Sequence, residues 1–164
     1  MALPTKILPG FSATLYAQPS TTPTALTVSA LSTYASVSAL AVSGNLVPVE
    51  AIPPFGQDDA VASFGVAGSR QSDKIPVQSA PTSMTITAAW NPSDAVLLLL
   101  RGDAYNGTID RTFVISATDG TGIVNYAFNG RVSQWDIDSQ PGAEAKVTFT
   151  IHPRGNQYGW SAST

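Results

Sequence analysis

An alternation of apolar and polar residues with a period of two runs through the second half of the chain, and it constrains the fold more than any other feature. Met84, Ile86, Ala88 and Trp90 alternate with threonine and alanine, and the pattern returns in residues 145–151. Successive side chains of a β-strand point to opposite faces, so this alternation predicts strands with one buried face. The second half is therefore predicted to be mainly β.

Turn dipeptides separate the apolar runs of this half, as they do in a β-meander. Strands are predicted at residues 112–116, 124–134 and 145–151, with turns at Asn106-Gly107 and Asp119-Gly120. In the longest run, Val124, Tyr126, Phe128 and Val132 share one parity, whereas Trp135 and Ile137 share the other. A change of parity predicts a β-bulge or a strand end near residues 133–135, because one extra residue moves every later side chain to the other face.

One helix is predicted, at about residues 92–102. The sequence Asn91-Pro92-Ser93-Asp94 supplies a polar cap and an early acid, and the apolar run up to Arg101 follows it. Gly102 is a natural stop. Because the run is apolar nearly all round, the helix is expected to be covered by packing against a sheet.

The first half has weaker signals. Residues 1–24 contain four prolines and are interpreted as an extended N-terminal arm. Residues 26–52 alternate small and β-branched residues with serine and threonine, which predicts two strands joined near Gly44-Asn45. Pro48 makes the second of these an edge strand or a bulged strand.

Two further segments complete the predicted organisation. Residues 53–83 are rich in glycine and proline and are interpreted as a long loop with a short strand at 60–66; long loops in compact domains are usually functional. Residues 153–164 form a polar C-terminal tail. The expectation is one domain, with a β-core at residues 25–152 and this loop as the leading candidate for an assembly surface.

Composition limits the classes of function. Charged residues make up only 12% of the 164 residues while apolar residues make up 43%. Such a chain exposes many serine, threonine, asparagine and glutamine side chains, hides surface against other subunits, or does both. The net charge of -3 disfavours tight nucleic-acid binding, which needs a basic patch. The absence of cysteine excludes disulfides and thiolate metal sites. The first eleven residues hold no apolar stretch typical of a secretory signal, and the run at 95–100 is too short to cross a bilayer, so we expect a soluble protein made in the cytoplasm.

No catalytic constellation is visible in the sequence, and no enzyme, metal or cofactor is expected. His152 is the single histidine and is interpreted as a polar residue at a strand end. The pairs Asp58-Asp59 and Asp136/Asp138 could bind a cation or divide acid and base roles, but neither has the further ligands that such a site needs. No phosphate-binding glycine motif occurs. The aromatic residues at strand spacing are assigned to the core; they are Trp90, Phe113, Tyr126, Phe128, Trp135 and Phe149.

The order of these pieces resembles the major tail tube proteins of long-tailed, noncontractile bacteriophages. The resemblance covers about residues 53–155 and is carried by the strand ending in Trp90, the helix, the Phe-x-Gly-x-Val run at Phe128, Gly130 and Val132, and the Pro141-Gly142-Ala143-Glu144-Ala145 segment before a Thr-rich strand. The Ala- and Ser-rich stretch at 24–43 departs from the family. The resemblance implies a β-sandwich or barrel-like tail tube fold with one flanking helix, similar to the tube protein of type VI secretion systems.

The resemblance also implies a function. The chain would form homohexameric rings that stack into a tube in the virion, assembled in the host bacterial cytoplasm around the tape-measure protein. The tube would end on tail terminator and distal tail proteins and later pass double-stranded DNA, without membrane insertion. By this analogy the 53–83 loop and the arms contact neighbouring subunits; the candidate contact residues are Phe11, Tyr16, Phe55, Asp58, Asp59, Phe64, Arg70, Asp73 and Lys74.

Net acidity would suit such a conduit, because acidic side chains facing the lumen repel DNA. The candidate lumen-facing acids flank the meander strands; they are Asp110, Asp119, Asp136 and Asp138. Two alternatives remain: a β-sandwich adhesion or carbohydrate-binding module of a virion or cell surface, with exposed aromatic residues and acid pairs as its site, and an acid-pair hydrolase, which lacks a supporting constellation.

Overall fold

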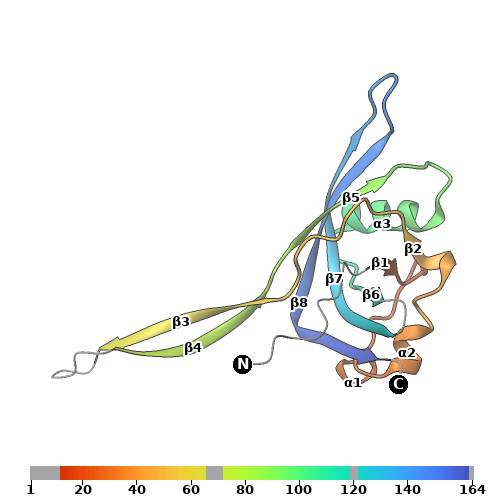
Figure 1. Ribbon diagram of the computed structural model, residues 1–164. Helices are drawn as coiled ribbons and strands as arrows, with labels where there is room; N and C mark the ends of the chain where they lie inside the picture. The colour runs from red at the N-terminus through yellow and green to blue at the C-terminus, as the bar shows by residue number, and fades with distance from the viewer. Residues whose placement is uncertain (1–11, 66–71, 119–121, 163–164) are drawn as a thin grey trace, which may run out of the picture.

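The computed structural model describes residues 12–65, 72–118 and 122–162; residues 57–65, 72–79 and 155–162 are described by their backbone alone. The fold is mainly β, with a curled antiparallel sheet of six strands in the order β2-β1-β6-β7-β8-β5 and a separate two-stranded hairpin, β3-β4 (Figure 1). The strands are β1 (Ser12–Ala17), β2 (Leu46–Val47), β3 (Gln57–Gly65), β4 (Ser72–Pro81), β5 (Met84–Ala89), β6 (Arg111–Thr118), β7 (Ile123–Asp138) and β8 (Lys146–Ala162). The helices are α1 (Val28–Leu31), α2 (Tyr34–Ser38), the 3-10 turn η1 (Ser43–Asn45) and α3 (Ala95–Asn106).

A short segment joins the two edges of the curled sheet at one end. Strand β2 pairs with β1 through Val47, and two residues later Val49 forms an isolated bridge with Ala88 of β5. The Glu50 N–H donates to the Thr87 carbonyl at 3.0 Å. Pro48 lies inside this segment, as expected for a proline at a short edge strand. The sheet is therefore barrel-like at this end.

The main core lies on the inner face of the curled sheet, and α3 covers it. Phe113, Phe128 and Phe149 are fully buried there together with Leu97 and Leu100 of α3. The predicted assignment of the strand aromatics to the core is correct for these three, while Tyr126 is about one-third exposed. Trp90 and Trp135 pack against the cluster without being fully buried.

A second, smaller cluster lies on the opposite face of β6 and β7, under α1 and α2. Leu31 and Val37 of these helices pack against Val114 and Ala127, which alternate along the strands with the residues of the main core. The prediction of two strands in residues 26–52 is therefore wrong for most of this segment. Thr27 instead caps α1 by accepting from the Ala30 N–H, and the hydroxyls of Thr33 and Ser38 donate to backbone carbonyls of the preceding turns.

The predicted helix exists, but it begins at Ala95 instead of residue 92 and ends at Asn106 instead of residue 102. Asp94 caps it, since its side chain accepts from the N–H groups of Val96 and Leu97. The helix runs through the exposed Gly102 and is capped at its end by Gly107, which adopts the left-handed conformation that glycine tolerates. The expectation that the apolar run would be covered on most sides is wrong for Leu98, which is 44% exposed.

Both terminal regions contribute strands to the sheet. Residues 12–17 of the presumed arm form β1. Every residue of β1 pairs with a residue of β6, from Phe113 to Thr118, and Leu15 and Ala17 are buried. The presumed tail continues β8 as far as Ala162, paired with β7. The sequence interpretation is corrected here, because pairing with an ordered neighbour stabilises segments whose own composition is too polar to indicate a strand.

Strand β7 contains the predicted bulge. Its register against β8 shifts between Ser133 and Trp135, and Gln134 between them has a φ of 53°. A second shift lies between Phe128 and Gly130. These bulges let a strand of 16 residues bend around the core.

Candidate assembly surfaces

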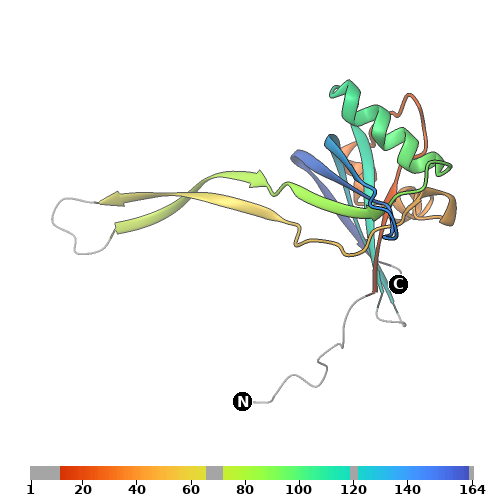
Figure 2. The same ribbon diagram turned by 90° about the horizontal axis from the view of Figure 1, so that it is seen from above.

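The first candidate surface is the β3-β4 hairpin, which projects far from the rest of the subunit (Figures 1 and 2). The 53–83 region is thus not a loop with one short strand, as its glycines and prolines suggested, but mainly a pair of antiparallel strands. At its base the Thr82 N–H donates to the Gly56 carbonyl at 3.1 Å. A two-stranded hairpin alone is marginally stable in water, so this one is expected to gain stability from a partner.

Most of the predicted contact residues of this region lie on the hairpin strands. The register pairs Phe64 with Asp73 and places Lys74 opposite Ser63. Asp58 and Asp59 are in β3, not in a loop. Phe11, Arg70 and the predicted lumen acid Asp119 lie outside the described residues.

Two other predicted contact residues lie in the body of the subunit. Tyr16 is part of β1 and packs, partly buried, against the cluster under α1 and α2. Phe55 is partly buried against the main core, and its ring meets that of Tyr126 edge-on at 5.3 Å between centroids. Their role between subunits stays a prediction.

Phe55 and Tyr126 also line an apolar pocket that the sequence did not indicate. Its volume is about 290 Å³, and its remaining lining comes from the inner face of β1, β6 and β7: Ala13, Ile115, Ala117 and Val124. The same face forms the main core further along these strands. The pocket is therefore the end of the barrel interior that α3 does not fill.

The outer face of β5 and β8 carries hydroxyl side chains. Thr85 lies beside Thr150, with 3.4 Å between their Oγ1 atoms, and Thr87 lies beside Thr148 at 3.5 Å. These four residues, the threonine face, alternate with the core residues of the same strands. The face is polar and carries no charge of its own.

His152 extends the threonine face by one position on β8. Its Nδ1 lies 2.8 Å from the Ser83 Oγ and its Nε2 lies 2.6 Å from the Ser133 Oγ. The histidine therefore joins the base of the hairpin to β7, and it lies within β8 instead of at a strand end. No group of three histidine, cysteine, aspartate or glutamate residues able to hold a metal ion occurs within the described ranges.

Next to the threonine face, the end of the β7-β8 ribbon carries exposed carboxylates, since Asp136 is paired with Thr148 and Asp138 with Lys146. Asp136 and Asp138 are exposed near the end of β7, and Glu144 is exposed in the following turn. We call these three residues the acidic tip. Lys146 lies opposite Asp138 and forms an ion pair with Glu50. The hydrogen bond from its ammonium group to the Glu50 carboxylate raises the pKa of Lys146, and the negative charges of Glu144 and Asp138 raise it further.

The fourth predicted acid, Asp110, is held by two cations. Its carboxylate accepts from Arg131 at 2.6 Å and also pairs with Arg154. Partial burial raises the pKa of Asp110, but the hydrogen bonds and charges of the two arginines outweigh this and lower it. The arginines are 40% and 50% exposed, so the cluster presents one net positive charge at the surface. We call Arg131 and Arg154 the arginine pair.

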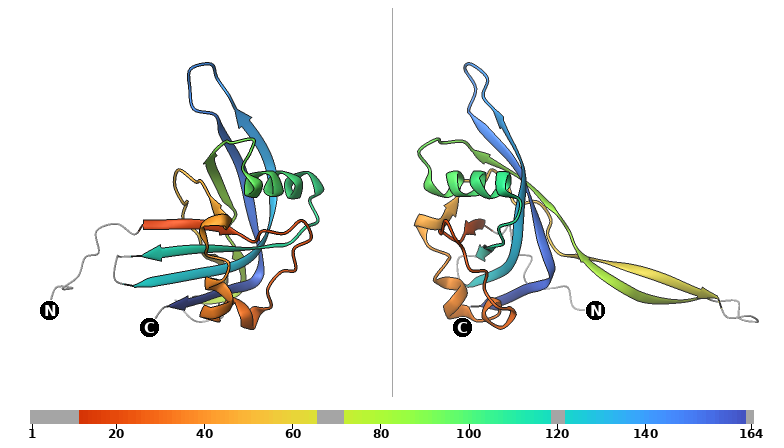
Figure 3. Two further views of the ribbon diagram at one scale, coloured as in Figure 1. Left: turned by 90° about the vertical axis from the view of Figure 1, so that its right-hand side faces the viewer. Right: turned by 180° about the vertical axis from the view of Figure 1, so that it is seen from behind.

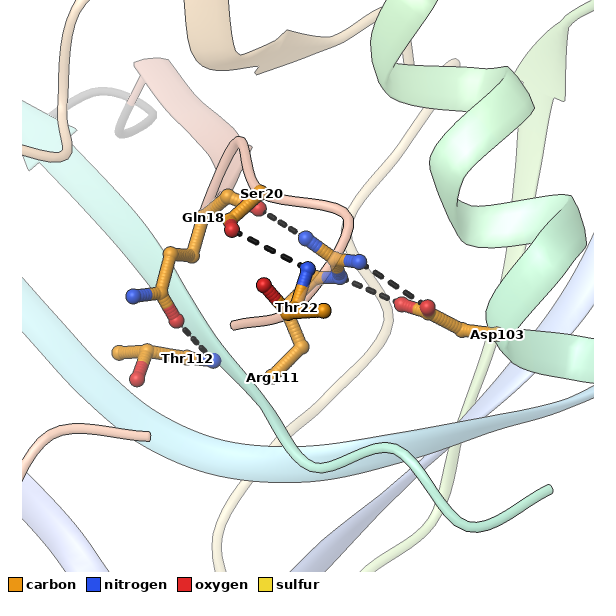
Figure 4. Close-up of polar contacts among 6 residues, drawn as sticks. All are labelled: Gln18, Ser20, Thr22, Asp103, Arg111 and Thr112. Atoms are coloured by element: carbon orange, nitrogen blue, oxygen red, sulfur yellow. Dashed lines mark hydrogen bonds and ion pairs between the residues drawn. The ribbon is translucent and has the colours of Figure 1, made fainter. Parts of the chain in front are cut away.

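A buried ion pair positions α3 against the sheet. The Arg111 guanidinium donates to both Asp103 oxygens, through Nε at 2.5 Å and Nη2 at 3.0 Å, and also to the Gln18 carbonyl (Figure 4). Both side chains are almost completely buried. The contact links α3, the start of β6 and the segment after β1. Sequence reasoning missed it, because nothing in the sequence distinguishes these two charges from exposed ones.

No protein-family model matches the chain, and no curated protein matches it by sequence. Solved structures do match its fold. A chain of the anti-feeding prophage (AFP) baseplate, determined by cryo-electron microscopy with six-fold symmetry, has a TM-score of 0.63 at 10% identity and covers 98% of this chain and 97% of its own. A chain of the SPP1 tail tube has a TM-score of 0.53 at 12% identity, with 87% of this chain and 73% of that one covered. These matches confirm the predicted tail tube fold.

Within the described residues no helix is both long and apolar enough to cross a membrane.

Proposed function

We propose that this chain is a structural subunit of a phage tail tube. Copies of it form hexameric rings, and the rings stack in the virion into a hollow conduit that encloses the tape-measure protein and later passes double-stranded DNA. The fold shared with the AFP baseplate and SPP1 tail tube chains supports the class of protein. The observation that carries the proposal for this chain is the projecting hairpin.

The hairpin is built for a contact outside its own subunit. Its strands pair over nine positions between Gln57 and Gly65, and they extend well beyond the sheet (Figure 2). Each strand has one edge without a strand partner within the described residues. Unpaired edges bind other chains readily, and a structure of this length in water needs a covering surface. A neighbouring copy in a closed ring or an adjacent ring supplies one.

The threonine face suits the wall of the conduit. The hydroxyl groups of Thr85, Thr87 and Thr148 can hydrogen-bond water, whereas Thr150 is buried and donates to the Gln134 side chain. None of the four side chains offers the positive charge that binds phosphate. Asp136 is paired with Thr148 at the margin of this face, and the acids of the tip would repel DNA wherever a neighbouring copy does not cover them. Asp110 would add little, because two arginines neutralise it.

Removal of the hairpin tests the proposal. Gln57 and Pro81 are paired at the hairpin base, so residues 58–80 can be replaced by an Asn-Gly turn without moving the sheet. We expect a folded subunit, with a melting temperature near that of the wild type, that stays monomeric in sedimentation velocity and forms no rings in electron micrographs. Assembly of the shortened chain into tubes would contradict the proposal.

A matched control separates loss of a contact from general damage. Tyr105 is 73% exposed on α3, which lies on the side of the molecule away from the hairpin (Figure 2). Tyr105→Ser therefore changes an exposed aromatic residue on an element that does not form the base of the hairpin. This variant should assemble like the wild type.

A further inference from the structure

Charge is segregated along the β7-β8 ribbon. The acidic tip places three carboxylates, those of Asp136, Asp138 and Glu144, at one end, and none of them has an ion-pair partner among the described residues. The arginine pair lies in the middle of the same ribbon, where Arg131 is paired with His152. Arg131 and Asp138 are seven positions apart on β7, which is about 23 Å at the rise of a strand.

The two charged patches cannot meet within one subunit, because the ribbon holds them apart. The acidic tip projects beyond α3 at the end of the molecule (Figures 1 and 3). A second copy displaced along the ribbon would bring its tip to the level of the arginine pair. A contact between two different patches of identical chains is heterologous and propagates head to tail.

The arginine pair has the chemistry to receive a carboxylate. The Nε of Arg131 binds Asp110, and its two terminal nitrogens make no hydrogen bond within the described residues. A guanidinium offers five N–H groups in a planar fork and binds carboxylates in a bidentate manner. Asp110 fixes the orientation of both arginines and leaves one positive charge uncompensated.

We propose that the acidic tip of one copy docks on the arginine pair of a second copy, so that charge complementarity sets the head-to-tail direction of assembly. The contact rests on the proposed function, since it joins subunits of the same tube. A phosphate of nucleic acid is the less favoured ligand of the arginines, because the cluster has a single net charge and the whole chain is acidic.

Two charge-inverted variants test the contact. The first is Asp136→Lys with Asp138→Lys, which makes the tip basic. The second is Asp110→Lys with Arg131→Glu and Arg154→Glu, which keeps both ion pairs of the cluster but inverts its net charge. Each variant alone should form no tubes, because its two patches then repel each other. An equimolar mixture should form tubes, because each patch then meets its complement on the other variant.

The controls make the outcome unambiguous. Circular dichroism and thermal unfolding establish that both variants are folded. Arg101→Glu inverts the charge of an exposed α3 residue that forms no ion pair with either patch among the described residues, and it should assemble normally. The contact is overturned if either variant forms tubes alone, if the mixture fails while the wild type assembles, or if a short DNA duplex binds the wild type and not the second variant. A wild-type chain that stays monomeric would instead overturn the proposed function.

Discussion

Breaking the buried ion pair of Arg111 and Asp103 is expected to cost more stability than any single exposed change. In the variant Asp103→Asn the guanidinium remains 1% exposed, without a counter-charge, and keeps only the Gln18 carbonyl and a neutral amide as acceptors. Removing one partner of a buried pair typically costs about 3 to 5 kcal/mol.

For a domain of this size each kcal/mol lowers the melting temperature by about 2 to 4 °C, so the expected decrease is roughly 6 to 20 °C. Thermal unfolding followed by circular dichroism at neutral pH measures it, and urea titration gives the free energy of unfolding directly. The double variant Asp103→Leu with Arg111→Met should recover most of the loss, because an apolar pair of similar volume removes the buried charge. A loss below about 1 kcal/mol in Asp103→Asn would refute the reasoning, since that is the cost of an exposed pair.

Three further changes have defined outcomes. Asp94→Ala removes both hydrogen bonds that cap α3 and should lower the free energy of unfolding, measured by urea titration, by about 1 kcal/mol. Asp94→Asn should keep most of the stability of the wild type, because asparagine also caps helices. Asn125 is 1% exposed, and neither polar atom of its amide has a hydrogen-bond partner in the part of the chain that the structure describes. Asn125→Val should therefore raise the free energy of unfolding by about 1 kcal/mol or more, and a decrease would mean that the amide is bonded in solution. The pKa of Asp110 is lowered in the folded protein, so its ion pairs stabilise the fold fully above the ordinary pKa of aspartate and lose this contribution as the pH falls through the lowered pKa. Below about pH 4, the melting temperature of the wild type should therefore fall more steeply than that of Asp110→Asn. Parallel curves of melting temperature against pH would contradict this.

The sequence predicted those elements whose structure is determined locally. Strand β5, the existence of α3 and the bulge at Gln134 are encoded by alternation, by polar residues before an apolar run and by a change of parity. The start of α3 was placed too early, because Asp94 was expected in the first turn of the helix and is instead its N-cap. The inner row of β6 and β7 was predicted for the same reason, because each strand buries one face against the same core.

Elements that depend on distant partners were not predicted. Strand β1 is flanked by prolines, and its place in the sheet follows from pairing with β6, about a hundred positions later in the chain. The alternation in residues 26–45 resembles a strand, but Leu31 and Val37 are buried as parts of short helices on the outer face. In the hairpin, Pro76 and the flanking glycines indicated a loop. The strands form nevertheless, because each one is stabilised by pairing with the other. The arginine pair and the acidic tip needed the register of β7 and β8 before they could be located.

The central claim, that the chain forms stacked rings around a conduit, is tested most directly by electron microscopy of the purified wild-type protein at high concentration. The proposal predicts hollow tubes built of six-fold rings, with the hairpins covered by neighbouring copies and the threonine face of Thr85, Thr87, Thr148 and Thr150 lining the lumen. Persistent monomers, or filaments without a central channel, would contradict it.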